Sequence, residues 1–157
     1  MLFLFIVYTI PMETRKEYSY GIVPLVKEGG EVKIFLIHQH GSLGDIFWGI
    51  PKGHQEGDEA PVETAKREVF EETALSPDIL DEKNVYTLDY EFVLNDVLIQ
   101  KQASYFIGWV SNNSFSKQDE EVLEAGWFSF EEAEKKFEFE RYKELLKWVS
   151  SSLGLDK

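Results

Sequence analysis

The stretch of residues 53–75, GHQEGDEAPVETAKREVFEETAL, constrains this chain more than any other. Its first seven residues are polar and include two glycines, which predicts a loop. Pro61 suits the first position of a helix, because its fixed φ and its missing N–H are tolerated there. Ala60 is then the N-cap residue, although it supplies no side-chain acceptor. We expect the helix to run to about Thr73, just before a Ser-Pro pair.

Three carboxylates share one arc of this predicted helix. Successive helical residues advance by about 100°, so Glu71 and Glu72 lie about 60° and about 40° to either side of Glu68. Arg67 precedes Glu71 by four residues, a spacing at which the two side chains can pair. The neighbouring arc is apolar and is expected to pack against a sheet; it consists of Val62, Ala65 and Val69.

This carboxylate cluster predicts a cation site. Carboxylates three and four positions apart have Cβ atoms about 5–6 Å apart, and each like-charged pair costs about 3 kcal/mol at an effective dielectric constant near ~20. Oxygen ligands with open positions suit Mg2+ or Mn2+, which would relieve that repulsion. Taken by itself, the cluster fits an ordinary solvated helix face better, because the whole chain is rich in glutamate. The surrounding pattern decides between the two interpretations.

The overall charge also favours cations. The chain has 29 acidic residues against 16 basic ones, a net charge of −13, so it lacks the positive stripe that grips nucleic acid, and we expect no stable nucleic-acid complex. A small phosphate-bearing substrate would need divalent cations to bind here, although an acidic surface also simply favours solubility. Cysteine is absent, which excludes thiol chemistry and fits the reducing cytoplasm, where we expect the protein to act.

The rest of the chain alternates strand and helix patterns with several hairpins. Gly29-Gly30 and Asn95-Asp96 are predicted to be turns. Pro24 predicts a bulge or an edge position within the first strand. The fold class is therefore α+β, with a mixed β-sheet between helices. The expected strands are 17–27, 32–38, 47–50, 85–94, 97–110 and 126–128, and two further helices follow, one capped by Ser129 with Glu132 and one over about 140–151.

The first ten residues, MLFLFIVYTI, are apolar and uncharged. They are too few to cross a bilayer, which takes about 20 residues, and they lack the basic start and cleavage site of a signal peptide. We therefore expect no membrane association. Two interpretations stay open: an added strand, paired with this sheet or with a second copy, or a natural start at Met12. We treat 1–157 as a single domain with residues 1–15 as an extension, either a monomer or a homodimer.

The spacing of the carboxylate helix resembles the Nudix box, G-x5-E-x7-R-E-U-x-E-E-x-G-U, in which U is aliphatic. The final glycine of the box is replaced by Ala74, which affects the turn at the end of the helix rather than the carboxylates. The resemblance covers about residues 16–150 and implies an α/β/α sandwich. The matching residues are Gly53, Glu59, Arg67, Glu68, Val69, Glu71, Glu72 and Leu75.

The resemblance implies hydrolysis of a nucleoside diphosphate linked to another group, by attack of water on phosphorus with Mg2+ or Mn2+. Its metal ligands would be Glu68 and Glu72, with Glu71 and the Gly53 carbonyl as further ligands. Arg67 would orient the carboxylates and Glu59 would brace the loop. The general base in this family is often a glutamate before the Trp-Phe strand; Glu121 matches best, Glu120 is the runner-up, and Glu68 is the alternative.

Segments outside the box are similar to asymmetrical diadenosine tetraphosphate hydrolases. They are FWGIPKGHQEGDE at residues 47–59, KQASYF at 101–106 and DEEVLEAGWFSFEEA at 119–133. The similarity implies a small nucleotide substrate, with diadenosine tetraphosphate cleaved to ATP and AMP. The implied substrate-binding residues are Lys52, His54, Lys101 and Tyr105, although Tyr105 lies in an apolar strand and is equally a core residue.

Other activities of the same family stay open. RNA 5′-pyrophosphohydrolases, nucleoside triphosphate pyrophosphohydrolases and diphosphoinositol polyphosphate hydrolases have a similar layout. An inositol polyphosphate would favour a basic pocket, and this acidic chain contains only three arginines. A regulatory module that binds a nucleotide without cleaving it is the alternative outside enzymes. Such a module would be expected to lack box carboxylates, and all of them are present here.

Overall fold

The computed structural model describes residues 1–4, 6, 12–117 and 120–155. Within those ranges the chain forms a seven-stranded sheet and three helices. No helix among the described residues is both long and apolar enough to span a bilayer. The elements are β1 Glu13–Glu28, β2 Glu31–His40, β3 Ile46–Gly49, β4 Lys52–His54, α1 Pro61–Thr73, β5 Ile79–Leu94, β6 Val97–Trp109, β7 Val122–Phe128, α2 Phe130–Lys136 and α3 Glu140–Ser152.

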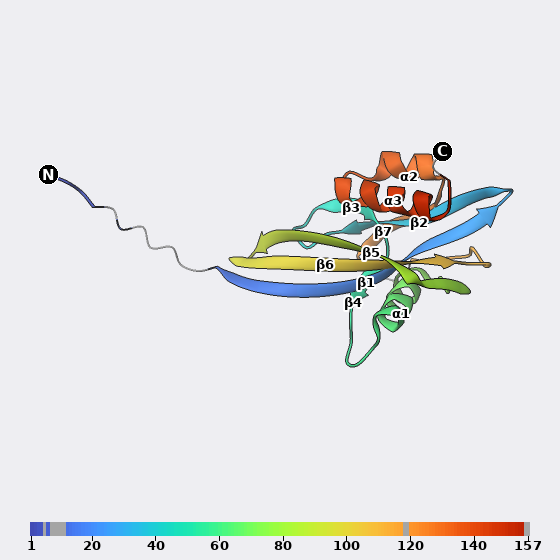
Figure 1. Ribbon diagram of the computed structural model, residues 1–157, viewed down its shortest axis with the longest axis horizontal. Helices are drawn as coiled ribbons and strands as arrows, with labels where there is room; N and C mark the ends of the chain where they lie inside the picture. Colours follow the sequence, from blue (N-terminus) through green and yellow to red (C-terminus); the bar gives the residue numbers. More distant parts are fainter. Residues whose placement is uncertain (5, 7–11, 118–119, 156–157) are drawn as a thin grey trace.

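The strand β1 is the centre of the sheet. It runs parallel to β6, from Glu13 opposite Val97 to Leu25 opposite Trp109, and antiparallel to β2 and β4. The strand order is β3-β2-β1-β6-β5, with β7 paired to β2. Helix α1 covers one face of this mixed sheet, and α2 and α3 cover the other (Figure 1). The predicted α/β/α sandwich is therefore confirmed.

Two hydrophobic cores lie on opposite faces of the sheet, and the alternation of side chains along each strand divides them. Ile22 and Val26 of β1 belong to the core that contains Ala65 and Val69 of α1. The intervening apolar residues of β1 and β2 belong to the core beneath α3; they are Val23, Leu25, Ile34 and Leu36. Both faces of these strands are buried, which explains why they read as continuous apolar runs.

Most predicted elements are confirmed, and the helix predicted from Pro61 to about Thr73 has those bounds. The two predicted turns have positive φ, at Gly29 and Gly30 and at Asn95 and Asp96. Ser129 caps α2 by accepting a hydrogen bond from the Glu132 N–H at 3.1 Å.

Two predictions about local structure were wrong. Pro24 lies in the central strand rather than at an edge; the sheet tolerates it because it falls between the segment of β1 that pairs with β4 and the segment that pairs with β2. Residues 52–54 form the strand β4 instead of a loop, because Ser19 to Gly21 of β1 offer them an antiparallel partner.

The predicted N-terminal strand lies largely outside the described residues. Residues 5 and 7–11 belong to the part of the chain that the structure does not describe. The described residues 1–4 and 6 are exposed and have no regular secondary structure. The strand β1 starts only at Glu13, so the interpretation of residues 1–10 as an added strand stays a prediction.

Helix α1 ends in a strained conformation at Ala74. This residue adopts a left-handed conformation, with φ of 62° and ψ of 11°, and its N–H donates to the Phe70 carbonyl at 2.8 Å. The family pattern has glycine at this position, and glycine adopts such a conformation without a steric penalty. Left-handed backbone costs an L-residue about 1–2 kcal/mol, so the chain keeps the turn in spite of alanine.

We therefore expect Ala74→Gly to stabilise the fold by about 0.5–1 kcal/mol, because the relief of strain exceeds the added freedom of the unfolded chain. The shift of the urea unfolding midpoint measures the effect. The matched control is Lys66→Gly, at an exposed position inside α1, which should destabilise by about 1 kcal/mol. A destabilised Ala74→Gly protein would contradict the strain assignment.

Candidate active site

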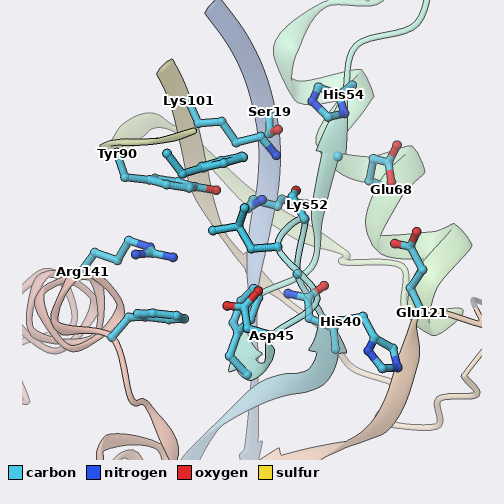
Figure 2. A pocket seen from close by; sticks show the side chains of 18 of the residues that line it. Ser19, His40, Asp45, Lys52, His54, Glu68, Tyr90, Lys101, Glu121 and Arg141 are labelled. Carbon is cyan, nitrogen blue, oxygen red and sulfur yellow. The ribbon is translucent and has the colours of Figure 1, made fainter. Parts of the chain in front are cut away.

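A cavity of about 660 Å³ opens at one end of the sheet. Its wall combines β1, β2, β4, β5, β6, the carboxylate face of α1, the loop after β2 and the start of α3. Figure 2 shows side chains from all these directions pointing into one space. Seven of the residues singled out in the sequence line this cavity; they are Lys52, Gly53, His54, Glu68, Glu72, Lys101 and Glu121.

Arg67 lies beside this cavity and donates hydrogen bonds to several residues around it. Its Nε and Nη2 donate to the two carboxylate oxygens of Glu59 at 2.8 and 3.0 Å. Its Nη2 also donates to the His54 carbonyl at 2.9 Å. Its Nη1 donates to Glu68 at 2.9 Å and to Glu71 at 3.2 Å. One guanidinium therefore joins helix α1 to β4 and to the loop between them.

Hydrogen bonds from Arg67 and from the Glu56 N–H lower the pKa of Glu59 from 4.5 to about 2. The same Glu59 carboxylate accepts a hydrogen bond from the Thr64 hydroxyl at 3.3 Å. The carboxylates raise the pKa of Arg67 further above its already high value. Glu59 thus connects Arg67 and Thr64 of α1 to the Glu56 N–H of the preceding loop, and its role as a brace of that loop stays a prediction.

Gly53 makes room for the Glu68 carboxylate. A Cβ atom at this position would collide with the carboxylate carbon and both oxygens of Glu68. The φ angle of Gly53 is not in the left-handed region, so glycine is required here for the close approach and not for its backbone freedom. The Gly53 backbone of β4 and the Glu68 carboxylate are consequently in close contact.

The three box carboxylates have different environments. Glu72 is only 8% exposed and lines the cavity. Glu68 is mostly buried, and burial raises its pKa, although the hydrogen bond from Arg67 opposes the shift. Glu71 is 54% exposed and lies outside the cavity wall, where it pairs with Arg67. Glu68 and Glu72 are therefore the better placed pair for a ligand in the cavity.

Lysine and histidine side chains line the same cavity as these carboxylates. Burial lowers the pKa of Lys52, and burial followed by the charge of Lys52 lowers the pKa of Lys101. Lys101 and His54 both approach one carboxylate oxygen of Glu17, with their nitrogens at 3.7 and 3.4 Å from it. Of the predicted substrate-binding residues, Lys101 and His54 thus meet at Glu17, and Lys52 lines the same cavity.

Glu121, which the sequence suggested as the general base, lies in the segment before β7 and lines the cavity. Its carbonyl accepts a hydrogen bond from the His40 N–H at 3.1 Å, which ties this segment to the end of β2. Figure 2 shows its side chain on the same side of the cavity as Glu68. Glu120, the runner-up, is exposed and does not line the cavity.

Tyr105 is placed differently from its predicted role in substrate binding. It is fully buried in the core beneath α3 and does not belong to the cavity wall. Successive side chains of β6 point to opposite faces of the sheet. Because both faces are buried around Tyr105, its side chain lies in the core whichever face it is on. We assign Tyr105 a packing role.

The carboxylates fit a divalent cation by their chemistry. Glu68, Glu72 and the Gly53 carbonyl offer only oxygen atoms, which Mg2+ and Mn2+ prefer, and the missing Cβ of Gly53 keeps that surface open. Across the described residues, no three acidic or histidine side chains converge on one point as in a preassembled metal site. Arg67 explains the spread, because it holds Glu68 and Glu71 toward itself.

Several cavity residues were not predicted from the sequence. Tyr90 comes from β5, and Phe139 and Arg141 come from the start of α3. His40, which sequence reasoning left unassigned, also lines the cavity. Tyr90, Phe139 and Arg141 lie outside the box, and the arrangement of β5 and α3 around the sheet brings them to the cavity. An arginine in the first turn of a helix, where cations are unfavourable, was the available signal for Arg141.

Glu59→Gln should remove the part of the pH dependence of stability that the Arg67 pair causes. Because the folded pKa of Glu59 is depressed to about 2, its contribution is full above the ordinary value of 4.5 and is lost as the pH falls toward 2. The difference in urea midpoint between the unaltered protein and the variant should therefore shrink steadily below about pH 4.5. Glu134→Gln, at an exposed position of α2, is the control. An equal difference at every pH would contradict the assignment.

The sequence comparisons agree with this geometry. The family model described as NUDIX domain matches residues 15–149. A protein of Mycobacterium tuberculosis (strain CDC 1551 / Oshkosh) that carries the name mutator protein MutT4 is 33% identical over 89 residues, which are 57% of this chain. Because the match covers 35% of that relative, the chain spans only about a third of its length.

Solved structures share the fold. A Caenorhabditis elegans Ap4A hydrolase in a binary complex aligns over 88% of this chain and 98% of its own, with a TM-score of 0.70 at 21% identity. The NUDIX domain of Shewanella oneidensis NrtR, complexed with ADP ribose, aligns over 88% and 89%, with a TM-score of 0.71 at 17% identity. The MutT protein from Methanosarcina mazei Go1 aligns over 90% and 99%, with a TM-score of 0.65 at 20% identity. These identities establish the fold alone, whereas the family model spans most of the chain, and the chain therefore belongs to the Nudix family.

Proposed function

We propose that this protein is a Nudix hydrolase that cleaves a diphosphate linkage in a nucleotide, with Mg2+ or Mn2+ as cofactor. The observation that carries the proposal is the cavity itself, which Glu68, Glu72 and Gly53 line together with the cations Lys52 and Lys101. Glu68, Glu72 and the Gly53 carbonyl would hold the cation, with Glu71 within reach from the rim. Such a cation neutralises phosphate charge, polarises the phosphoryl oxygen and lowers the pKa of water.

The reaction is attack of water on phosphorus. The water oxygen forms a bond to one phosphorus, and the bond from that phosphorus to the bridging oxygen breaks. The bridging oxygen leaves with the electron pair on the departing phosphate, and the water proton passes to a base. Glu121 suits this role better than Glu68, because Glu68 accepts a hydrogen bond from Arg67 at 2.9 Å and has a part in holding the cation. Arg67 positions Glu68 and does not touch the substrate.

The favoured substrate is diadenosine tetraphosphate, which would yield ATP and AMP. Lys52, His54 and Lys101 are the phosphate-binding candidates, since lysines bind phosphate as point charges. A cavity of about 660 Å³ lies within the usual range for small-molecule sites. The fold of an Ap4A hydrolase is among the similar structures, and sequence segments around the box resemble that group, which supports this choice over other nucleotides.

A nucleotide-binding role without hydrolysis is the second candidate. One observation favours it: among the described residues, the carboxylates do not converge on one point as they would in a preassembled metal site. The NUDIX domain of NrtR was solved with ADP ribose bound, so the fold accommodates a nucleotide ligand. Retention of every carboxylate of the box favours hydrolysis over this alternative.

Glu72→Gln should lower the turnover number for diadenosine tetraphosphate by about 100-fold or more, because a cation ligand contributes several kcal/mol to stabilising the transition state. Chromatographic separation of the nucleotides in the presence of Mg2+ measures ATP and AMP. EDTA should abolish both products. Glu82→Gln, an exposed β5 position, is the control and should retain full activity. Binding of the dinucleotide without any product would favour the second candidate.

Gly53→Ala should impair catalysis while leaving the fold intact. The added Cβ displaces only the flexible end of Glu68, and a misplacement of about 1 Å costs on the order of 100-fold in rate. Turnover number and unfolding temperature are measured together. Gly126→Ala on β7 is the matched control, because its Cβ would meet only the Phe128 ring at the ordinary contact distances of 3.5 and 3.6 Å. Equal activity of the two variants would refute the role of Gly53.

A further inference from the structure

Arg141 lies on the wall of the cavity away from the carboxylates. It belongs to the first turn of α3, and Figure 2 shows it across the cavity from Glu68 and Glu121, with Lys52 between them. Its guanidinium carbon lies over the Tyr90 ring at 4.3 Å and over the Phe139 ring at 4.0 Å. These aromatic contacts occupy the faces of the guanidinium and leave its N–H edge as the part that can donate hydrogen bonds.

Arg141 forms no ion pair with a carboxylate among the described residues, although Asp45 and Glu91 line the same cavity. Its side chain is hydrogen-bonded to Tyr142, whereas its buried Nε donates no hydrogen bond. By contrast, Arg67 contacts the carboxylates of Glu59, Glu68 and Glu71. A buried donor without a partner is unfavourable, and so is a cation in the first turn of a helix. In a chain of 29 acidic residues, such an arginine is well placed to receive an anion from outside.

Other cations of the cavity add to the positive charge near Arg141. Lys52 and Lys101 line the same cavity. An anion bound between these three cations would remove a mutual repulsion that the empty cavity retains. Glu68 and Glu121 lie on one side of the cavity and Arg141 on the other, with Lys52 between them (Figure 2).

We propose that Arg141 binds a phosphate of the substrate that is not the phosphate attacked by water, so that the site selects a chain of three or more phosphates. The inference rests on the proposed function for the position of the cleaved linkage. Tyr90 and Phe139 hold the guanidinium plane, and its N–H edge meets the distal phosphate in the planar geometry that arginine shares with phosphate. Arg141 is a specificity-determining residue in this account.

Binding of inorganic tripolyphosphate in EDTA tests Arg141 without any turnover. Isothermal titration calorimetry should show that Arg141→Met weakens binding by about 10- to 100-fold, the range for a charge-assisted hydrogen bond. Arg141→Lys keeps the charge and should weaken it less. Methionine retains much of the packing against Tyr90 and Phe139, and an unchanged unfolding temperature verifies this. Arg15→Met is the control, because Arg15 is 58% exposed and pairs with Glu13 on β1.

Kinetics with Mg2+ supply the second readout. Arg141→Met should raise the KM for diadenosine tetraphosphate by about 10-fold or more and should change the kcat/KM for ADP ribose, which has two phosphates, by less than about twofold. Equal effects on both substrates, tripolyphosphate affinity that matches Arg15→Met, or no tripolyphosphate binding by the unaltered protein would overturn the inference. Weakened tripolyphosphate binding in a protein that hydrolyses no nucleotide would instead reject the proposed function and keep Arg141 as an anion site.

Discussion

The hydrogen bonds of the Arg67 guanidinium are the interaction on which the site depends. They join Glu59 of the loop, the His54 carbonyl of β4 and two glutamates of α1 through one guanidinium. Three chain segments that could otherwise move independently are thereby fixed relative to each other. This fixed arrangement is what brings Gly53 against Glu68. A lysine could not replace this arginine, because a single ammonium group lacks the planar fork that reaches both oxygens of Glu59 and a carbonyl together.

The second organising feature is the separation of charge within the cavity. The chain has a net charge of −13, yet Lys52, Lys101 and Arg141 line the same cavity as Glu68 and Glu72, and Arg141 lies across this cavity from Glu68 (Figure 2). A phosphate chain laid across the cavity would meet cationic side chains at one end and carboxylates that require a cation at the other. Under the proposed function, a divalent cation and Arg141 would each offset part of the negative charge of a polyanionic substrate in this acidic protein.

Local patterns in the sequence predicted much of this structure. Helix α1, its apolar arc and the Arg67–Glu71 pair follow from helical periodicity, and the box pattern singled out Gly53, Glu68 and Glu72, which line the cavity. Long-range pairing was beyond such reasoning: β4 forms because β1 is available to it, and Pro24 sits in a central strand because β1 changes partners there. Tyr105 proved to be buried, and Arg141, Tyr90 and Phe139 join the cavity only through tertiary packing.

The central claim is that this cavity directs water onto phosphorus. Hydrolysis of diadenosine tetraphosphate in water enriched in oxygen-18, with Mg2+ present, tests it most directly. Mass spectrometry of the products should find one heavy oxygen in the phosphate group of a single product, either AMP or ATP, because one water molecule attacks one phosphorus in each turnover. Nucleotide products without heavy oxygen, or no products from any nucleotide with a diphosphate linkage, would contradict the account.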